Sequence, residues 1–213
     1  MRSPTPTHPA DATGSARPAG RRQADRVRLA RILRERCSLR GEFRLASGEI
    51  SPVYFDCKRA TLDPEGLHLV ADLMLDLVDD LRAKGTRIDA VGGPSVGADP
   101  ILAGMAVRSY QRGAPLPAFL IRSKVKDHGT GRYIENDIPA GASVLLVEDV
   151  VTSAGSVRRA LDRVVAAGLE VAAIACIVDR ERGGEAALTP HPLHALFTRT
   201  ELEAGLSPDP TTG

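Results

Sequence analysis

The chain has 213 residues, 43% of them hydrophobic, and its 28 Lys and Arg are almost balanced by 27 Asp and Glu. This length predicts a single domain with a sizeable core. The net charge of +1 provides no field that would attract nucleic acid or an acidic membrane, and no apolar stretch is long enough to span a bilayer. Three scattered cysteines without a CxxC pair favour a reducing cytoplasm and predict neither a disulfide nor a zinc site.

The N-terminal part of the chain differs in composition from the rest. Residues 1–25 are rich in Pro, Ala, Arg, Ser and Thr and show no periodic apolar stripe, so we expect a disordered tail. The tail also lacks the apolar core of a secretory signal. The folded domain would then span residues 26–213.

Apolar residues at helical spacing predict one helix over Arg26–Leu39 and another over Pro64–Lys84. Between them, residues 41–58 predict two extended segments joined by a turn. Farther along, Asp99 and Pro100 are typical of the start of another helix.

Four short apolar runs lack the alternation of a half-exposed strand. They are Ile88–Val91, Pro117–Ile121, Val144–Val147 and Val171–Val178. Such runs are typical of strands buried on both faces, as in a parallel sheet covered by helices. The sequence therefore predicts an α/β fold, with one more short strand at His194–Phe197.

A long polar stretch, residues 122–132, follows the second of these runs and carries Arg122, Lys126 and His128. A solvated charged loop is the simpler interpretation. The alternative is a mobile cationic lid that neutralises negative charge on a leaving group and excludes water.

The third run ends in two consecutive carboxylates, Glu148 and Asp149, followed by a hydroxyl-rich loop and an amphipathic helix. Buried charges need partners, so a ligand explains this pair better than an ordinary turn capped by Ser153. The carboxylates can accept hydrogen bonds from a diol or bind a divalent metal, directly or through water. The hydroxyls of Thr152 and Ser156 and the free N–H groups of a helix start can bind an anion. Together they suit a ribose with a phosphate on its 5′ carbon.

The stretch 144–156 resembles the phosphoribosyl pyrophosphate (PRPP) motif of type I phosphoribosyltransferases. Three other stretches resemble segments of orotate phosphoribosyltransferases: residues 45–56 the hood, residues 122–129 the catalytic loop, and residues 179–184 the loop beside orotate. The resemblance covers about residues 26–206, with the motifs in family order. It implies a type I phosphoribosyltransferase fold, in which a central parallel sheet is flanked by helices and carries a small N-terminal hood.

The same resemblance implies a hood built from residues 40–60 together with residues 193–198, and a core over residues 61–192. The implied reaction transfers the 5-phosphoribosyl group from PRPP to orotate in pyrimidine nucleotide (UMP) synthesis. Magnesium is the implied cofactor, held by substrate and water near Asp149 and not directly by the protein. The family also implies a homodimer in which the lid of one subunit closes over its neighbour's site.

Roles follow from the resemblance by position. The catalytic residues would be Arg122, Lys126, His128 and Asp149. The PRPP-binding residues would be Arg122, Ser123, Lys126, His128, Glu148, Asp149, Val150, Val151, Thr152, Ser153, Ala154, Gly155 and Ser156. The orotate-binding residues would be Tyr54, Phe55, Thr152 and Arg180. A loop with backbone N–H groups turned to the pyrophosphate would consist of Gly93, Pro94, Ser95, Val96 and Gly97.

The chain departs from the family pattern at three positions. Ala46 and Gly97 stand where family members often carry lysine. Ser123 replaces the usual second lysine of the lid, and Lys124 is a candidate substitute. For the two hood aromatics, a half-buried strand filling a small core is the alternative to a place beside the base.

Two other functions stay open at this point. A purine phosphoribosyltransferase would share the phosphate motif, although the lid and the Asp179–Arg180 loop point away from it. A PRPP-sensing regulator that binds nucleic acid would need an added reading domain or a basic face. A tail of about 25 residues is too short for such a domain.

Overall fold

The computed structural model describes residues 17–44, 50–124 and 133–205. The helices are α1 (Ala19–Ile32), the π-helical turn η1 (Leu33–Cys37), α2 (Lys58–Thr61), α3 (Pro64–Ala83), α4 (Asp99–Gln111), α5 (Gly155–Ala166), α6 (Gly184–Ala187) and α7 (Arg199–Ala204). The strands are β1 (Ser38–Arg44), β2 (Ile50–Phe55), β3 (Ala90–Pro94), β4 (Ala118–Ile121), β5 (Ile134–Glu135), β6 (Ser143–Val151), β7 (Glu170–Asp179) and β8 (Leu193–Thr198). None of these helices is long and apolar enough to cross a membrane.

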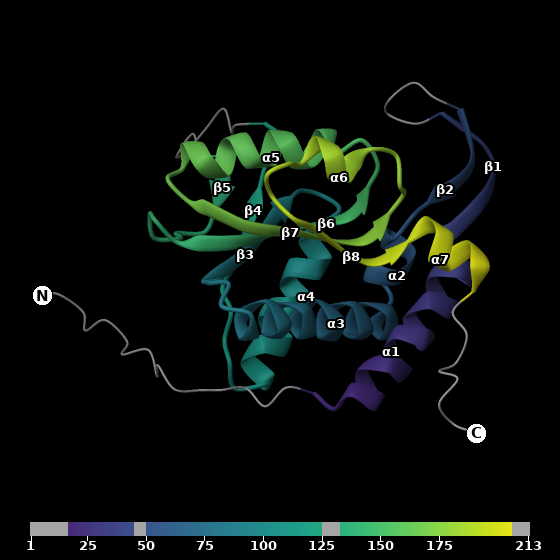
Figure 1. Cartoon of the computed structure of the whole chain (residues 1–213), viewed down its shortest axis with the longest axis horizontal. Helices are drawn as coiled ribbons and strands as arrows, with labels where there is room; N and C mark the ends of the chain where they lie inside the picture. Colours follow the sequence, from purple (N-terminus) through teal and green to yellow (C-terminus); the bar gives the residue numbers. More distant parts are fainter. Residues whose placement is uncertain (1–16, 45–49, 125–132, 206–213) are drawn as a thin grey trace, which may run out of the picture.

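Six strands form the central sheet in the order β5-β4-β3-β6-β7-β8 (Figure 1). β3, β4, β6, β7 and β8 pair in parallel, and β5 alone pairs antiparallel at one edge. This confirms the predicted α/β class, with a sheet that is mostly parallel. A separate two-stranded sheet, β1 with β2, stands beside the core as the hood (Figure 1).

The middle strand β6 is buried on both faces, as its unbroken apolar run predicts. Leu145 and Val147 belong to the core cluster that α1, α3 and α4 cover. Val144 and Leu146 belong to the cluster that α5 covers on the other face. Alternate residues of the strand therefore point to opposite faces of the sheet. Both faces are covered by helices, which explains why all four residues of the run are apolar.

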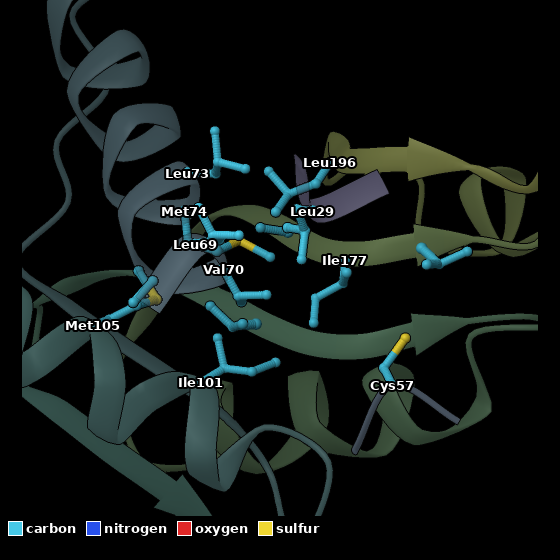
Figure 2. Packing of buried hydrophobic residues seen from close by; sticks show 14 of the residues in the cluster. Leu29, Cys57, Leu69, Val70, Leu73, Met74, Ile101, Met105, Ile177 and Leu196 are labelled. Atoms are coloured by element: carbon cyan, nitrogen blue, oxygen red, sulfur yellow. The ribbon is translucent and has the colours of Figure 1, made fainter. Parts of the chain in front are cut away.

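Helices α1, α3 and α4 lie on one side of the sheet, and α5 and α6 lie on the other (Figure 1). Figure 2 shows side chains of the first layer gathered beside Ile177 of β7, with Leu29 from α1, Val70 from α3 and Ile101 from α4. Leu29, Val70 and Ile101 are all fully buried. This packing fixes β6 and β7 beneath the loops that follow them.

The prediction that residues 193–198 complete the hood is wrong. These residues form β8, which pairs in parallel with β7 from Ile174↔Leu193 to Asp179↔Thr198. Phe197 is fully buried in the main core. The core therefore extends beyond residue 192, and among the described residues only β1 and β2 form the small sheet.

The expected tail boundary at residue 25 is also wrong, because α1 begins at Ala19. Arg17, just before the helix, contacts Asp72 of α3 at 2.6 Å and Asp25 at 2.7 Å. This segment docks through ion pairs, so its sequence shows no apolar stripe of the kind that reveals a packed helix. Residues 1–16 of the expected tail lie outside the described residues.

Asp72 is the centre of this ion-pair cluster and is only 2% exposed. Its carboxylate also accepts from Arg108 at 2.8 Å and pairs with Arg112 at 3.0 Å. Burial alone would raise the pKa of Asp72, but the hydrogen bonds from Arg108 and Arg112 outweigh it and lower the pKa to about 2. The cluster thus joins the N-terminal segment, α3 and α4 electrostatically.

Asp72→Asn is expected to lower the free energy of unfolding at pH 7 by about 3 kcal/mol, because Arg17, Arg108 and Arg112 lose the buried carboxylate that they share. A lowered folded-state pKa means that the stabilisation is present above the unfolded value near 4 and is lost as pH falls toward 2. The two proteins should therefore converge in stability near pH 2. Urea unfolding followed by circular dichroism measures both effects.

Asp80→Asn is the matched control, since Asp80 lies on the same helix and pairs with Arg22 at 2.8 Å but is 55% exposed. It should cost less than about 1 kcal/mol. Equal losses in the two variants would show that Asp72 gains nothing from its burial among arginines.

Candidate functional site

The candidate site is a cleft at the carboxyl ends of β3 and β6. In the sheet, β4 lies beside one edge of β3 and β6 lies beside its other edge. The direction in which successive strands are added therefore reverses between β3 and β6. In open α/β sheets this switch point is where ligands bind. The cleft has a volume of about 530 Å³ and is lined by Tyr54, Phe55, Lys58, Pro94, Ser95, Val96, Gly97, Glu148, Asp149, Val150, Thr152, Ser153, Ser156 and Arg180.

A second cleft of about 500 Å³ lies at the opposite, amino ends of the strands. Its cations are already engaged with the protein: Arg82 donates to the carbonyl of Ile88 at 2.5 Å, and Arg87 pairs with Asp89 at 2.8 Å. It lacks the convergence of acids, hydroxyls and cations found at the carboxyl ends, which makes the first cleft the candidate site.

The two acids of the cleft lie inside β6, which runs on to Val151 instead of ending at Val147. Glu148 is only 5% exposed. Its Oε1 accepts from the backbone N–H of Asp149 at 3.1 Å, and its Oε2 accepts from the Ser156 hydroxyl at 2.8 Å. These bonds fix the acid across the turn from the first residues of α5.

Burial and the neighbouring charge of Asp149 raise the pKa of Glu148 to about 8. The hydrogen bonds from Ser156 and from the Asp149 N–H work against this rise. Before a ligand binds at neutral pH, the acid pair therefore carries less than two full negative charges.

Asp149 is held close to the loop that follows β3. Its Oδ1 accepts from the backbone N–H of Val150 at 2.8 Å. A Cβ placed on Gly97 would lie 2.7 Å from that same Oδ1 and 2.8 Å from Cγ. Position 97 therefore has no room for a side chain unless the Asp149 carboxylate moves.

Gly97→Ala is expected to displace the Asp149 carboxylate and lower the kcat/KM of a reaction catalysed in this cleft by about 10- to 100-fold, as small misplacements of reacting groups do. Stability should change little, because the clash is with the end of a side chain and not with backbone. Steady-state kinetics and thermal unfolding measure the two effects. Gly20→Ala, whose Cβ would meet nothing within 4 Å, is the control. Unchanged kinetics in Gly97→Ala would show that the position of this carboxylate is unimportant.

The hydroxyl-rich loop brings Thr152, Ser153 and Ser156 to the cleft. The N-cap of α5 is Ala154, whose methyl group cannot accept a hydrogen bond and whose φ of 59° is left-handed. The first N–H groups of the helix are therefore left for an anion. Val151 and Ala154 do not line the cleft, because their side chains are buried in the core below it.

Some other predicted loop residues also lie behind the cleft wall. Gly155 begins α5 and does not line the cleft. Gly93 lies within β3, where a Cβ would come 2.1 Å from the carbonyl oxygen of Val147. The cleft is bounded instead by the four residues after it in the predicted loop, Pro94, Ser95, Val96 and Gly97.

Three of the residues expected beside the base, Tyr54, Phe55 and Arg180, line the cleft. Tyr54 is 36% exposed, whereas Phe55 is 4% exposed and also packs in the core. Arg180 follows β7 and is 3% exposed. Its backbone N–H donates to the carbonyl of Val151 at 2.9 Å, and the next N–H, that of Glu181, donates to Asp179 at 2.9 Å. The turn after β7 thus holds a buried guanidinium at the cleft.

The structure does not bring Arg122 to this cleft. Its guanidinium pairs with Glu135 of β5 at 3.1 Å, because β5 pairs directly with β4, the strand that precedes Arg122. Arg163 of α5 donates to the carbonyls of Arg122 and Ser123, and its guanidinium stacks on Tyr133 at 4.3 Å. The start of the predicted lid is therefore anchored to α5.

The other expected lid residues, Lys126 and His128, lie outside the described residues, while Ser123 and Lys124 are exposed. One cleft residue was missed by the sequence reasoning: Lys58, at the start of α2. The sequence feature that could have indicated Lys58 is its position, because it lies three residues after Phe55, which was expected beside the base.

Magnesium fits the donor set of the cleft. In the described part of the chain, no group of three or more His, Cys, Asp or Glu is placed to hold a metal ion. Mg²⁺ commonly uses only one or two carboxylates, keeps several waters and takes the rest of its ligands from substrate phosphates. Asp149 lines the cleft and is such a carboxylate.

Comparisons with known proteins agree with this geometry. Residues 60–190 match the phosphoribosyl transferase domain family. An orotate phosphoribosyltransferase of Rhodopirellula baltica is 40% identical over 170 residues, which cover 79% of this chain and 88% of that protein. A crystal structure of Mycobacterium tuberculosis orotate phosphoribosyltransferase has a TM-score of 0.71 and 32% identity, covering 84% of this chain and 98% of the other.

A second structure of the M. tuberculosis enzyme, in complex with PRPP, has a TM-score of 0.66 and 29% identity, covering 84% of this chain and 92% of the other. The likeness extends over the core sheet and the greater part of the sequence. The chain therefore belongs to the phosphoribosyltransferase family and, within it, to the orotate phosphoribosyltransferases.

Proposed function

We propose that this protein transfers the 5-phosphoribosyl group from PRPP to orotate, giving orotidine 5′-monophosphate and pyrophosphate. The observation that carries the proposal is the convergence, in one cleft, of the acid pair, the hydroxyl loop and Arg180 at the switch point of the sheet. Relatives named orotate phosphoribosyltransferase that match most of the chain support the choice of base. This reaction would place the protein in pyrimidine nucleotide synthesis.

Different residues of the cleft would bind different groups of PRPP. Thr152, Ser153 and the uncapped start of α5 would bind the 5′-phosphate, because N–H groups and the helix dipole favour an anion there. Asp149 and Glu148 would bind the ribose hydroxyls while positive charge develops on the sugar ring. A carboxylate beside that ring stabilises the transition state more than the ground state, which is what acceleration requires.

The base would lie against Arg180, with Tyr54 and Phe55 beside it. A guanidinium presents planar, paired donors, which match the carboxylate and ring carbonyls of orotate. Its burial removes competing water and strengthens this pairing. Thr152 lines the same cleft and would contact both the phosphate and the base.

Magnesium is part of the proposal, with Asp149 as the protein group nearest to it through water. When bound, Mg²⁺ would neutralise charge on the pyrophosphate. The lid cations Lys126 and His128 would close over the departing pyrophosphate, as their sequence positions indicate. For Arg122 to join them, its pair with Glu135 would have to open, and such an exposed pair is weak, about 0–1 kcal/mol.

We also propose a homodimer in the cytoplasm. Val107 and Tyr110 on α4 are 58% and 76% exposed and, three residues apart, lie on the same side of the helix, which would suit a subunit interface. All three cysteines are buried and free, which favours a reducing compartment. Sedimentation equilibrium should give twice the chain mass of 22.6 kDa, and a monomer at micromolar concentration would contradict the dimer.

The activity is tested by following orotate absorbance with PRPP and Mg²⁺, in parallel with adenine, hypoxanthine and uracil. Orotate should be consumed and the other three bases should be left almost unchanged. Preferential use of adenine or hypoxanthine would favour a purine phosphoribosyltransferase instead. No turnover, combined with retention of nucleic acid on a filter, would favour a regulator.

A further inference from the structure

Lys58 is a cation that lines the cleft, and none of the substrate contacts proposed above involves it. It is the first residue of the short helix α2, which directly follows the hood strand β2. Its Nζ pairs with the carboxylate of Asp56 at 3.0 Å. Asp56, which directly follows β2, thus anchors this ammonium group beside the hood.

The surroundings keep Lys58 charged. The Asp56 carboxylate raises the pKa of Lys58 more than burial lowers it, and the charge of Asp149 adds to the rise. The side chain remains 44% exposed, so the ammonium group has freedom to swing from Asp56 toward a ligand. Lys58 lines the same cleft as Glu148 and Asp149, so its ammonium group can reach a ligand held by the acid pair.

The rest of the cleft leaves one part of the substrate without a cation. The loop Pro94–Gly97 has no charged side chain, and Gly97 has no room for the lysine that family members often carry there. Arg122 is engaged with Glu135. Among the described residues that line the cleft, the cations are Lys58 and Arg180, and Arg180 is assigned to the base.

We propose that Lys58 is a catalytic residue that binds the pyrophosphate group of PRPP and stabilises the negative charge on its leaving oxygen. The inference rests on the proposed function. In the proposed function, the 5′-phosphate binds the hydroxyl loop, the ribose hydroxyls bind the two acids, and orotate binds Arg180. The diphosphate would then lie against the remaining lining residues, which are Lys58 and the loop after β3. Lys58 thus supplies the charge that position 97 cannot.

The bond changes define what Lys58 does. The bond from ribose C1 to the pyrophosphate oxygen breaks, and both electrons go to that oxygen. The lone pair of orotate N1 forms the new bond to C1, and the N1 proton passes through water to the released pyrophosphate. Because negative charge grows on the leaving oxygen, a fixed ammonium group beside it lowers the barrier.

The test compares Lys58→Ala, Lys58→Arg and the control Arg59→Ala. Arg59 neighbours Lys58 and lies 3.7 Å from the same Asp56, but it is 53% exposed and does not line the cleft. Lys58→Ala should lower kcat/KM for PRPP by about 100-fold, the typical loss for one charge-stabilising group. Lys58→Arg should recover part of that loss, and Arg59→Ala should stay within about threefold of the wild type.

Calorimetry separates the pyrophosphate role from other roles without turnover. Pyrophosphate with Mg²⁺ should bind Lys58→Ala at least about tenfold more weakly, a loss of one charge contact. Orotidine 5′-monophosphate, which lacks the diphosphate, should bind both proteins alike. Equal weakening for the two ligands, unchanged PRPP kinetics, or a loss confined to the KM for orotate would each overturn the proposal.

The two proposals fail in different ways. A wild-type protein that binds pyrophosphate but never consumes orotate would contradict the proposed base, while the Lys58→Ala comparison would still decide whether Lys58 binds the diphosphate. Thermal unfolding of both Lys58 variants checks that the fold is kept, which we expect because the side chain is nearly half exposed.

Discussion

Asp149→Asn is expected to lower kcat/KM for PRPP by about 1,000-fold, at the upper end of what one lost electrostatic group costs. Asparagine keeps the shape of the side chain. Its amide oxygen can still accept the hydrogen bond from the Val150 N–H, which is 2.8 Å long in the wild-type protein. Only the negative charge is removed, and under the proposed function that charge would lie beside the sugar ring on which positive charge develops. The loss should therefore appear in kcat as well as in kcat/KM.

Steady-state kinetics with varied PRPP and saturating orotate measure this effect. Asp162→Asn is the matched control, because Asp162 is an exposed acid on α5 that does not line the cleft. Activity of Asp149→Asn within threefold of the wild type would remove this carboxylate from the mechanism. A loss of the same size in Asp162→Asn would indicate a general effect of charge.

Arg180→Ala is expected to lower kcat/KM for orotate by about 100- to 1,000-fold, because an orotate carboxylate would then be buried without its partner. PRPP binding should change by less than about twofold, since its groups lie on the other residues of the cleft. Arg180→Lys should restore little, because an ammonium group lacks the planar pair of donors. Calorimetry with each ligand separates the two affinities.

Arg182→Ala serves as the control for Arg180→Ala. Arg182 is exposed, lies two residues farther along the same loop and does not line the cleft. Equal weakening of PRPP and orotate by Arg180→Ala would contradict its assignment to the base. A similar orotate defect in Arg182→Ala would point to the loop as a whole.

The buried strands were the most predictable part of the fold. Runs such as Val144–Val147 are typical of strands that lie between two helical layers, and the structure confirms this prediction. Their ends were less predictable. β6 continues through Glu148 and Asp149 to Val151, because parallel pairing with β7 holds polar residues in the strand, and that pairing is not visible in the local sequence.

Long-range electrostatic pairing explains two further differences. The segment before Arg26 is ordered by Arg17 reaching Asp72, 55 residues away, and composition alone suggested disorder. Arg122 matched the lid pattern, yet its nearest anion in the fold is Glu135. A sequence shows that a cation is present but not which of several acids it will meet.

The site itself could be predicted where its chemistry is local. The acid pair and the hydroxyl loop are adjacent in the chain and line the cleft together. Lys58 could not be assigned in this way, since it comes from the hood side of the fold and meets the acids only through tertiary packing. The close approach of position 97 to the Asp149 carboxylate likewise joins the loop after β3 to β6, between residues 52 positions apart in the numbering.

A crystal structure with orotidine 5′-monophosphate tests the central claim most directly. The 5′-phosphate should lie at Thr152–Ser156, the two ribose hydroxyls at Glu148 and Asp149, and the base at Arg180. Nucleotide density at another place on the protein, with this cleft empty at saturating ligand, would contradict the account.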